Sequence, residues 1–256
     1  MANKLRYIST VCVCLVTLLI CAHANAQSNV LTFCYDPYPP YTFGTTGAPQ
    51  GGLKVELLNA VVAEIEELEA ETILLPWKRC QALAKRGTVD GILPLFKNEE
   101  RATYLEFTKG TFPQLSTFWY NKAKFPDGLD WYGNFEKLSH LKLGMLNGAH
   151  IHAEMEQVFA DGLGIQRARD MDSLLGLLTR QRVDLIAIDD NVGRYMVSKL
   201  GLTETIGAIK LPISLQYSYF GLSKTSGADK YVGRFNQVIS ELDSKGTIES
   251  LHLGQY

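Results

Sequence analysis

Two oppositely charged residues, far apart in the sequence, could together bind a small polar molecule. Arg101 is predicted to open or lie in a short helix, and its guanidinium can donate two parallel hydrogen bonds to a carboxylate. Its alternative role is a surface ion pair with Glu99 or Glu100. Asp189 directly follows an apolar stretch at residues 183–188, and ligands of α/β folds bind where parallel strands end. Arg101 and Asp189 are therefore candidate ligand-binding residues.

Neighbouring polar residues offer alternatives to these roles. Asp190 could replace Asp189, although it could also cap the helix that follows, and we expect Asp190 or Asn191 to form that cap.

His150 and His152 are two residues apart and would not face each other on a helix, so we predict no metal site. The sequence has no Gly-x-Ser-x-Gly elbow, phosphate-binding loop or zinc-type spacing. We predict binding without a cofactor.

The N-terminus has the features of a cleaved signal peptide. Lys4 and Arg6 precede an apolar run at residues 11–22, which is shorter than the roughly 20 residues needed to span a bilayer. Ala24 and Ala26 then fit the small-x-small pattern of signal peptidase cleavage. We predict a signal peptide at residues 1–26 and a periplasmic mature protein; an uncleaved anchor is the alternative.

Two cysteines remain after the predicted cleavage. Cys34 lies in a predicted strand and Cys80 near the start of a predicted helix. An even number of cysteines in an oxidising compartment favours a disulfide, and two buried thiols are the alternative. A lipoprotein anchored at Cys21 is disfavoured because Ile20 is bulky where a lipobox requires a small residue.

The periodicity of apolar residues predicts an α/β fold. In the first half, strands are expected at residues 30–35, 72–75 and 89–95, and helices at 53–69 and 76–86, with a loop at 36–52. Strands that alternate with helices in this order form a parallel sheet with crossover helices.

A similar unit follows, so we predict two Rossmann-like lobes. Its strands are expected at residues 141–146 and 183–188, and its helices at 150–159 and 171–180. Extended stretches at 115–124 and 214–223 would form a two-strand hinge, and a helical region at 230–251 would return to the first lobe. The predicted domains are residues 27–118 plus 221–256 for lobe 1 and 119–220 for lobe 2.

The composition disfavours a nucleic-acid partner. The formal net charge is -2, and charged residues make up 20% of the chain without a basic stripe.

Short motifs resemble one family of exported proteins in their order and spacing along the chain. They are Tyr35-Asp36-Pro37-Tyr38-Pro39-Pro40-Tyr41, Pro76-Trp77-Lys78-Arg79, Gly87-Thr88-Val89-Asp90-Gly91, Glu99-Glu100-Arg101, Glu106-Phe107-Thr108, the stretch 184–189, and Phe235-Asn236 with Lys245-Gly246-Thr247. With them, nearly all of the mature chain resembles the extracellular solute-binding proteins of the polar amino-acid family, which have the type II periplasmic binding fold.

The resemblance implies roles for charged and backbone groups. In the family, an arginine at the position of Arg101 binds the ligand carboxylate. An acidic residue at the position of Asp189 accepts hydrogen bonds from the ligand ammonium. The loop that contains Gly148 and Ala149 precedes a helix, and its backbone N–H groups would attract an anion.

The resemblance also implies an aromatic site. Rings at the places of Trp77, Tyr38 and Tyr41 would sandwich the ligand side chain, and local core packing is their alternative role. The chain departs from the family at Pro94-Leu95-Phe96-Lys97, where amino-acid binders usually carry hydroxyl residues. Two explanations remain open. The ligand could lack the usual ammonium contacts, or backbone groups of the first lobe could replace the missing hydroxyls. Phe96 could also line the pocket.

The implied function is capture of an amino acid or related carboxylate by lobe closure, with delivery to an ABC permease. Such a carrier is expected to be a monomer and not an enzyme. Two alternatives share the fold: a dehydratase-like enzyme acting on a small carboxylate, and a ligand sensor module.

Overall fold

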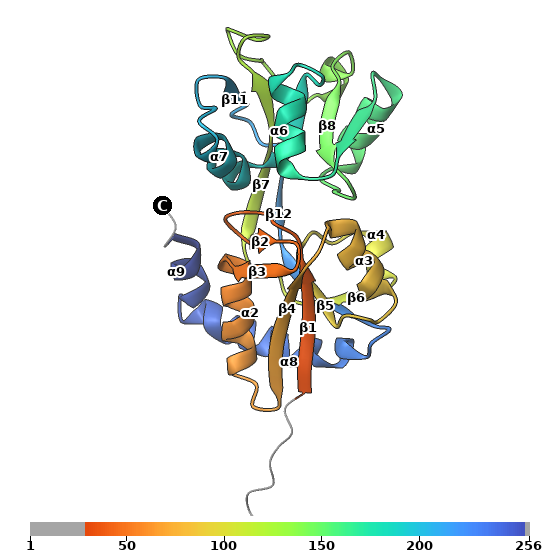
Figure 1. Ribbon diagram of the computed structural model, residues 1–256, viewed down its shortest axis with the longest axis vertical. Coiled ribbons are helices and arrows are strands. Elements are labelled where there is room, and N and C mark those ends of the chain that lie inside the picture. Colours follow the sequence, from red (N-terminus) through yellow and green to blue (C-terminus); the bar gives the residue numbers. More distant parts are fainter. Residues whose placement is uncertain (1–28, 254–256) are drawn as a thin grey trace, which may run out of the picture.

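The chain folds into two α/β lobes that are stacked along the long axis of the molecule (Figure 1). This computed structural model describes residues 29–253. The predicted signal peptide and its cleavage site lie outside these residues. Between residues 29 and 253, no helix combines the length and the apolar character needed to cross a membrane.

The first lobe is built on a five-stranded sheet with the order β4-β1-β5-β13-β6. Its strands are β1 (Asn29–Tyr35), β4 (Leu68–Leu74), β5 (Gly91–Leu95), β6 (Leu105–Phe107) and β13 (Tyr219–Ser223). β1 pairs in parallel with β4 and β5, as the sequence predicts, whereas β13 pairs antiparallel with β5 and β6. The last strand to join this sheet therefore comes from the C-terminal part of the chain.

Helices cover both faces of this sheet. They are α2 (Leu53–Ala63), α3 (Trp77–Lys85), the short α4 (Glu99–Ala102), α8 (Val232–Ser244) and α9 (Thr247–Leu253). Phe33 packs in a core with residues of α2 and α8, while the adjacent Cys34 packs with residues of α3. Successive side chains of a strand point to opposite faces, which explains why the central strands are apolar at most positions.

The predicted disulfide is confirmed. Cys34 of β1 and Cys80 of α3 are bonded, with Cα atoms 5.4 Å apart. The bond fixes α3 to the first strand of the sheet, and α3 carries several residues of the site described below.

The second lobe contains a sheet with the order β11-β7-β10-β8-β9, and β12 also pairs with β7. The strands are β7 (Pro113–Asn121), β8 (Leu143–Leu146), β9 (Ile165–Ala168), β10 (Leu185–Asp189), β11 (Ile206–Ala208) and β12 (Ser214–Tyr217). Helices α5 (Ala153–Asp161), α6 (Met171–Thr179) and α7 (Asp190–Lys199) and the short 3-10 helix η1 (Phe135–Leu138) pack around it. Another 3-10 helix, η2 (Ala228–Tyr231), precedes α8 in the first lobe.

The two crossings between the lobes lie side by side. Thr111 donates its backbone N–H to the carbonyl of Ser218, and Ser218 donates to the carbonyl of Phe112, at 2.9 and 3.1 Å. All of β7 pairs with strands of the second sheet, so this crossing precedes Pro113. The domain limits at residues 118/119 and 220/221 stay predictions.

Several predicted element limits are wrong. The helix expected at 53–69 ends at Ala63, and β4 already begins at Leu68. Ile65 and Leu68 keep the apolar spacing of the helix and are buried, so the pattern gave no sign of its end. The expected loop at 36–52 contains a hairpin of β2 (Phe43–Thr45) and β3 (Ala48–Gly51). The C-terminal helical region is divided at Gly246, whose φ is 73°.

Candidate functional site

Arg101 lies buried between the lobes. Asn98 caps α4 by accepting a hydrogen bond from the Arg101 backbone at 2.8 Å, which fixes the start of this one-turn helix. The Arg101 side chain is 3% exposed. Its Nη1 donates to the Phe96 carbonyl at 2.7 Å and its Nη2 to the Gly148 carbonyl of the second lobe at 3.0 Å.

The guanidinium has no anionic partner. Among the ion pairs of residues 29–253 none includes Arg101, so the predicted alternatives Glu99 and Glu100 form no salt bridge with it. Its Nε is buried without a hydrogen-bond partner. Burial lowers the pKa of the guanidinium, and Tyr104 and Glu100 oppose this shift. A buried cation that lacks a salt-bridge partner is costly, so this position favours binding of an anion.

The loop around Gly148 meets the first lobe through a carbonyl. Besides the bond from Arg101, the Gly148 carbonyl accepts one from Trp77 Nε1 at 3.3 Å. Gly148 has a φ of 74°, and a Cβ there would lie 3.0 Å from Gln81 Nε2 and 3.3 Å from Lys78 Cγ. Glycine therefore allows the loop backbone to approach α3 closely.

The prediction of a helix N-terminus directly after this loop is wrong. α5 begins at Ala153, and the ring of His152 caps it by accepting from the Met155 backbone at 3.4 Å. The N–H of Ala149 is bonded to the Leu146 carbonyl, and its own carbonyl accepts from Arg167. Gly148 and Ala149 thus orient arginine side chains in this structure.

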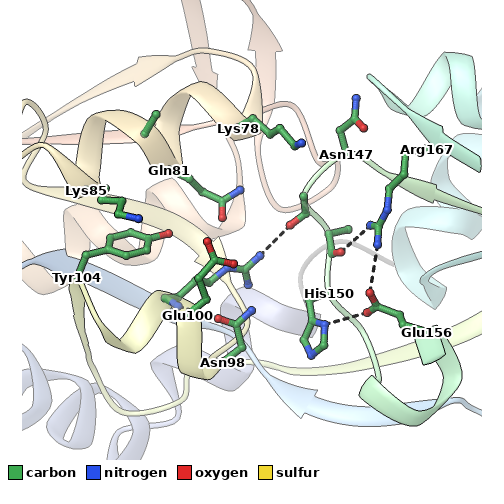
Figure 2. A pocket seen from close by; sticks show the side chains of 14 residues that line it. Lys78, Gln81, Lys85, Asn98, Glu100, Tyr104, Asn147, His150, Glu156 and Arg167 are labelled. Carbon is green, nitrogen blue, oxygen red and sulfur yellow. Dashed lines mark hydrogen bonds and ion pairs between the residues drawn. The ribbon is translucent and has the colours of Figure 1, made fainter. Parts of the chain in front are cut away.

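A cleft of about 600 Å³ lies beside Arg101, between α3 and α4 of the first lobe and the 147–150 loop of the second (Figure 2). Most of its lining residues have polar or charged side chains. Its lining residues are Lys78, Gln81, Ala82, Lys85, Asn98, Glu100, Arg101, Tyr104, Asn147, Gly148, Ala149, His150, Glu156 and Arg167. On the second-lobe side, Glu156 pairs with His150 at 2.9 Å and with Arg167 at 3.1 Å.

Tyr38, Tyr41 and Asp189 form a second, deeper group. The two tyrosine rings stack with centroids 6.1 Å apart. The Tyr41 hydroxyl donates to the Asp189 carboxylate at 3.3 Å, and the Asp189 backbone donates to the Tyr38 hydroxyl at 3.4 Å. Gln114 Nε2 also donates to this carboxylate at 3.3 Å. This group crosses the lobe interface, because both tyrosines belong to the first lobe and Asp189 ends β10 of the second.

Asp189 is itself the cap of α7, so the prediction that Asp190 or Asn191 forms this cap is wrong. The Asp189 carboxylate accepts from the Val192 backbone at 3.0 Å. The helix begins immediately after β10, which leaves Asp189 as the last residue before it. Burial raises the pKa of Asp189 to about 6.

Two charged residues near this group were not predicted from the sequence. Burial raises the pKa of Asp36 to about 7, and Asp36 directly follows β1. The rule that selects Asp189 at the end of β10 could also have selected Asp36. Lys54 is buried in the first turn of α2, where its Nζ donates to the Thr111 hydroxyl at 2.7 Å and lies 3.8 Å from the centre of the Phe112 ring.

The sequence contained a signal for Lys54 as well. It precedes the buried Leu57, Leu58 and Val61 by three, four and seven residues, which places a lysine on the apolar face of the helix. Burial lowers the pKa of Lys54, and the negative charge of Asp189 opposes that shift.

The predicted site residues therefore divide into two groups. Arg101, Trp77, Gly148 and Ala149 meet beside the cleft, with the Arg101 guanidinium 5.4 Å from the centre of the Trp77 ring. Phe96 joins them through its carbonyl. The described part of the chain holds no cluster of three or more His, Cys, Asp or Glu residues that could bind a metal.

Comparisons with known proteins show a clear family pattern. The model of the bacterial extracellular solute-binding proteins, family 3, matches residues 31–253. No curated protein matches the chain in sequence.

Solved structures share the fold at low sequence identity. An ancestral arginine-binding protein bound to arginine is 17% identical with a TM-score of 0.74, and the match covers 90% of this chain and 99% of that one. The arginine-, lysine-, histidine-binding protein ArtJ from Geobacillus stearothermophilus is 17% identical with a TM-score of 0.74, over 89% and 95%. A histidine kinase sensor domain with similarity to periplasmic binding proteins is 20% identical with a TM-score of 0.74, over 89% and 96%.

Proposed function

Because the chain belongs to the bacterial extracellular solute-binding proteins of family 3, we propose that it captures an amino acid or a related carboxylate and delivers it to an ABC permease. The solute binds between the lobes, with its carboxylate on the guanidinium of Arg101. The protein acts as a periplasmic monomer and binds its solute without chemical change.

The buried guanidinium of Arg101 is the observation that carries this proposal. It contacts two carbonyl oxygens and has a free Nε, although a guanidinium in such a place pairs best with an anion in a two-pronged arrangement. A solute carboxylate would satisfy these donors and remove the cost of the uncompensated charge. The cleft of about 600 Å³ beside it is within the range of small-molecule sites.

The structural neighbours agree with this class of ligand. Two of them carry arginine-binding or arginine-, lysine- and histidine-binding in their names. Their low identity to this chain supports the fold alone, so the carboxylate that amino acids share is the part of the ligand that we infer from the site itself.

A sensor module is a second candidate function. It is favoured by one observation, the match to a histidine kinase sensor domain over 89% of this chain. Both functions use ligand-dependent lobe closure, and they differ in the partner that receives the closed form.

A thermal-shift screen of residues 27–256 tests the proposal. The panel contains the amino acids, small mono- and dicarboxylates, and their amides. A solute at 100 times its Kd should raise the free energy of unfolding by about 2.7 kcal/mol. If solutes that lack a carboxylate stabilise the protein as well as those that carry one, or if none stabilises it, the proposal is wrong.

A further inference from the structure

The cleft beside Arg101 has more positive than negative charge in its wall. Its cationic side chains are Lys78, Lys85, Arg101 and Arg167, and its acids are Glu100 and Glu156. Glu156 is already paired with Arg167 and His150. The formal net charge of the whole chain is -2, so this local excess does not follow from the composition.

Three of these cations are left without an acidic partner. Within residues 29–253, none of the ion pairs includes Lys78, Lys85 or Arg101. Of the two acids in the cleft wall, Glu156 is engaged with His150 and Arg167, and Glu100 is exposed, as are Lys78 and Lys85. The four cations and two acids of the wall give a formal excess of two positive charges, so a solute with one negative charge would leave half of this excess uncompensated.

Lys78 and Arg101 reach the same part of the second lobe from different elements. Arg101 Nη2 bonds to the Gly148 carbonyl, and a Cβ on Gly148 would lie 3.3 Å from Lys78 Cγ. Lys78 extends from α3 toward Asn147, with Gln81 beside it on the same face of the helix (Figure 2). Lys85 is farther along α3 and lies 5.8 Å from the centre of the Tyr104 ring.

We infer that the solute of this cleft carries two anionic groups, such as an acidic amino acid or a short dicarboxylate. Arg101 takes one carboxylate, and Lys78 takes the second, with the amides of Gln81 and Asn147 as further donors. Amide side chains add hydrogen bonds without adding charge, so they suit a carboxylate that a lysine neutralises. This inference rests on the proposed function, and it excludes a cationic solute as the preferred ligand.

Matched pairs of solutes test the inference directly. Isothermal titration calorimetry with L-glutamate and L-glutamine, and with succinate and succinamate, compares solutes of similar size that differ in one negative charge. We expect the acid of at least one pair to bind up to about fivefold more tightly than its amide, since one partly exposed ion pair contributes up to roughly 1 kcal/mol. L-arginine should bind more weakly than L-glutamine.

Variants assign this preference to Lys78. Lys78→Met should remove most of the difference between acid and amide, while Lys97→Met, which changes a lysine outside the cleft, should leave it intact. Glu100→Gln removes the opposing charge and should strengthen binding of the acid. The preference should also decline as salt screens the charges.

The outcomes separate the two proposals. If the amides or L-arginine bind as tightly as the acids, or if Lys78→Met weakens acid and amide equally, the inference is wrong while the proposed function stands. If no carboxylate-bearing solute of the panel binds, the proposed function fails and the inference fails with it.

Discussion

The role of Arg101 depends on the shape of its side chain as much as on its charge. Arg101→Lys keeps the charge but loses the planar pair of donors, so we expect a carboxylate solute to bind about ten- to a hundredfold more weakly, as hydrogen bonds to charged groups contribute roughly 1.5–3 kcal/mol. Calorimetry measures this loss. Arg234→Lys on α8 is the control, and unchanged affinity in Arg101→Lys would remove Arg101 from the site.

The buried carboxyl of Asp189 should give the protein a measurable pH dependence. Its pKa is raised from 3.8 to about 6 by burial, so the folded state binds a proton more tightly than the unfolded state. Its contribution therefore favours folding below pH 4 and declines as the pH rises to 6. Two pKa units correspond to about 2–3 kcal/mol.

Urea unfolding between pH 4 and pH 7 isolates this effect. Asp189→Asn cannot ionise, so its free energy of unfolding should fall less over this range than that of the wild-type protein. Asp36, whose pKa of about 7 acts in the same direction, is present in both proteins and does not affect the difference. Parallel pH profiles would show that Asp189 titrates normally in the folded state.

The sequence predicts those site residues whose chemistry follows from their position along one element. Arg101, Trp77 and Gly148 belong to motifs of a known family and do meet at the cleft. The contacts of Lys54 with Thr111 and Phe112 could not be predicted because these residues belong to a crossing between the lobes that is distant in the sequence. Separating the cleft from the deeper group of Tyr38, Tyr41 and Asp189 also needs the three-dimensional structure.

At the scale of elements, the central strands are predicted well and the helix ends poorly. Strands buried on both faces are nearly continuous apolar runs, and β5 and β10 are recognisable in this way, while β1 is interrupted by Thr32. The end of α2 was hidden because buried residues of the next turn continue its spacing. The β2–β3 hairpin was missed because its strands are short and mostly exposed.

Packing of α7 on β7 depends on one glycine. A Cβ on Gly193 would lie 2.2 Å from the Trp119 ring, and Trp119 is a buried residue of β7. We expect Gly193→Ala to lower the free energy of unfolding by about 1–3 kcal/mol, because the indole or the helix must move. Chemical denaturation of the variant measures this loss.

Gly233 on α8 is the matched control. A Cβ there would have no atom within 4 Å, so Gly233→Ala should raise the free energy of unfolding by about 0.4–1 kcal/mol through the lower entropy of the unfolded chain. If Gly193→Ala is as stable as Gly233→Ala, then α7 does not pack on Trp119 as closely as the structure shows.

At the scale of the whole molecule, hydrogen bonds join the lobes at two places. Beside the cleft, the Gly148 carbonyl accepts hydrogen bonds from Trp77 and Arg101. Deeper in the interface, Tyr38 and Tyr41 form hydrogen bonds with Asp189. The two crossings between the lobes are bonded to each other at Thr111 and Ser218, so they can act as a common pivot. The equilibrium between open and closed lobes then depends on the bonds at these two places.

Tyr41→Phe tests this dependence, since it removes one hydroxyl from a ring that is otherwise fully buried. The hydroxyl donates to Asp189 and accepts from Asn191 Nδ2 at 3.1 Å, and both partners belong to the second lobe. A net loss of about 1 kcal/mol would reduce the ratio of closed to open molecules about fivefold. Small-angle X-ray scattering should therefore give a larger radius of gyration for the unliganded variant than for the wild-type protein.

A saturating solute should restore the wild-type value, because the closed form is the one that binds it on both sides. Tyr132→Phe, at a tyrosine that is 80% exposed, should leave the scattering unchanged. Equal radii for Tyr41→Phe and the wild-type protein would mean that the deeper group does not hold the lobes together and that closure depends on the contacts at Gly148.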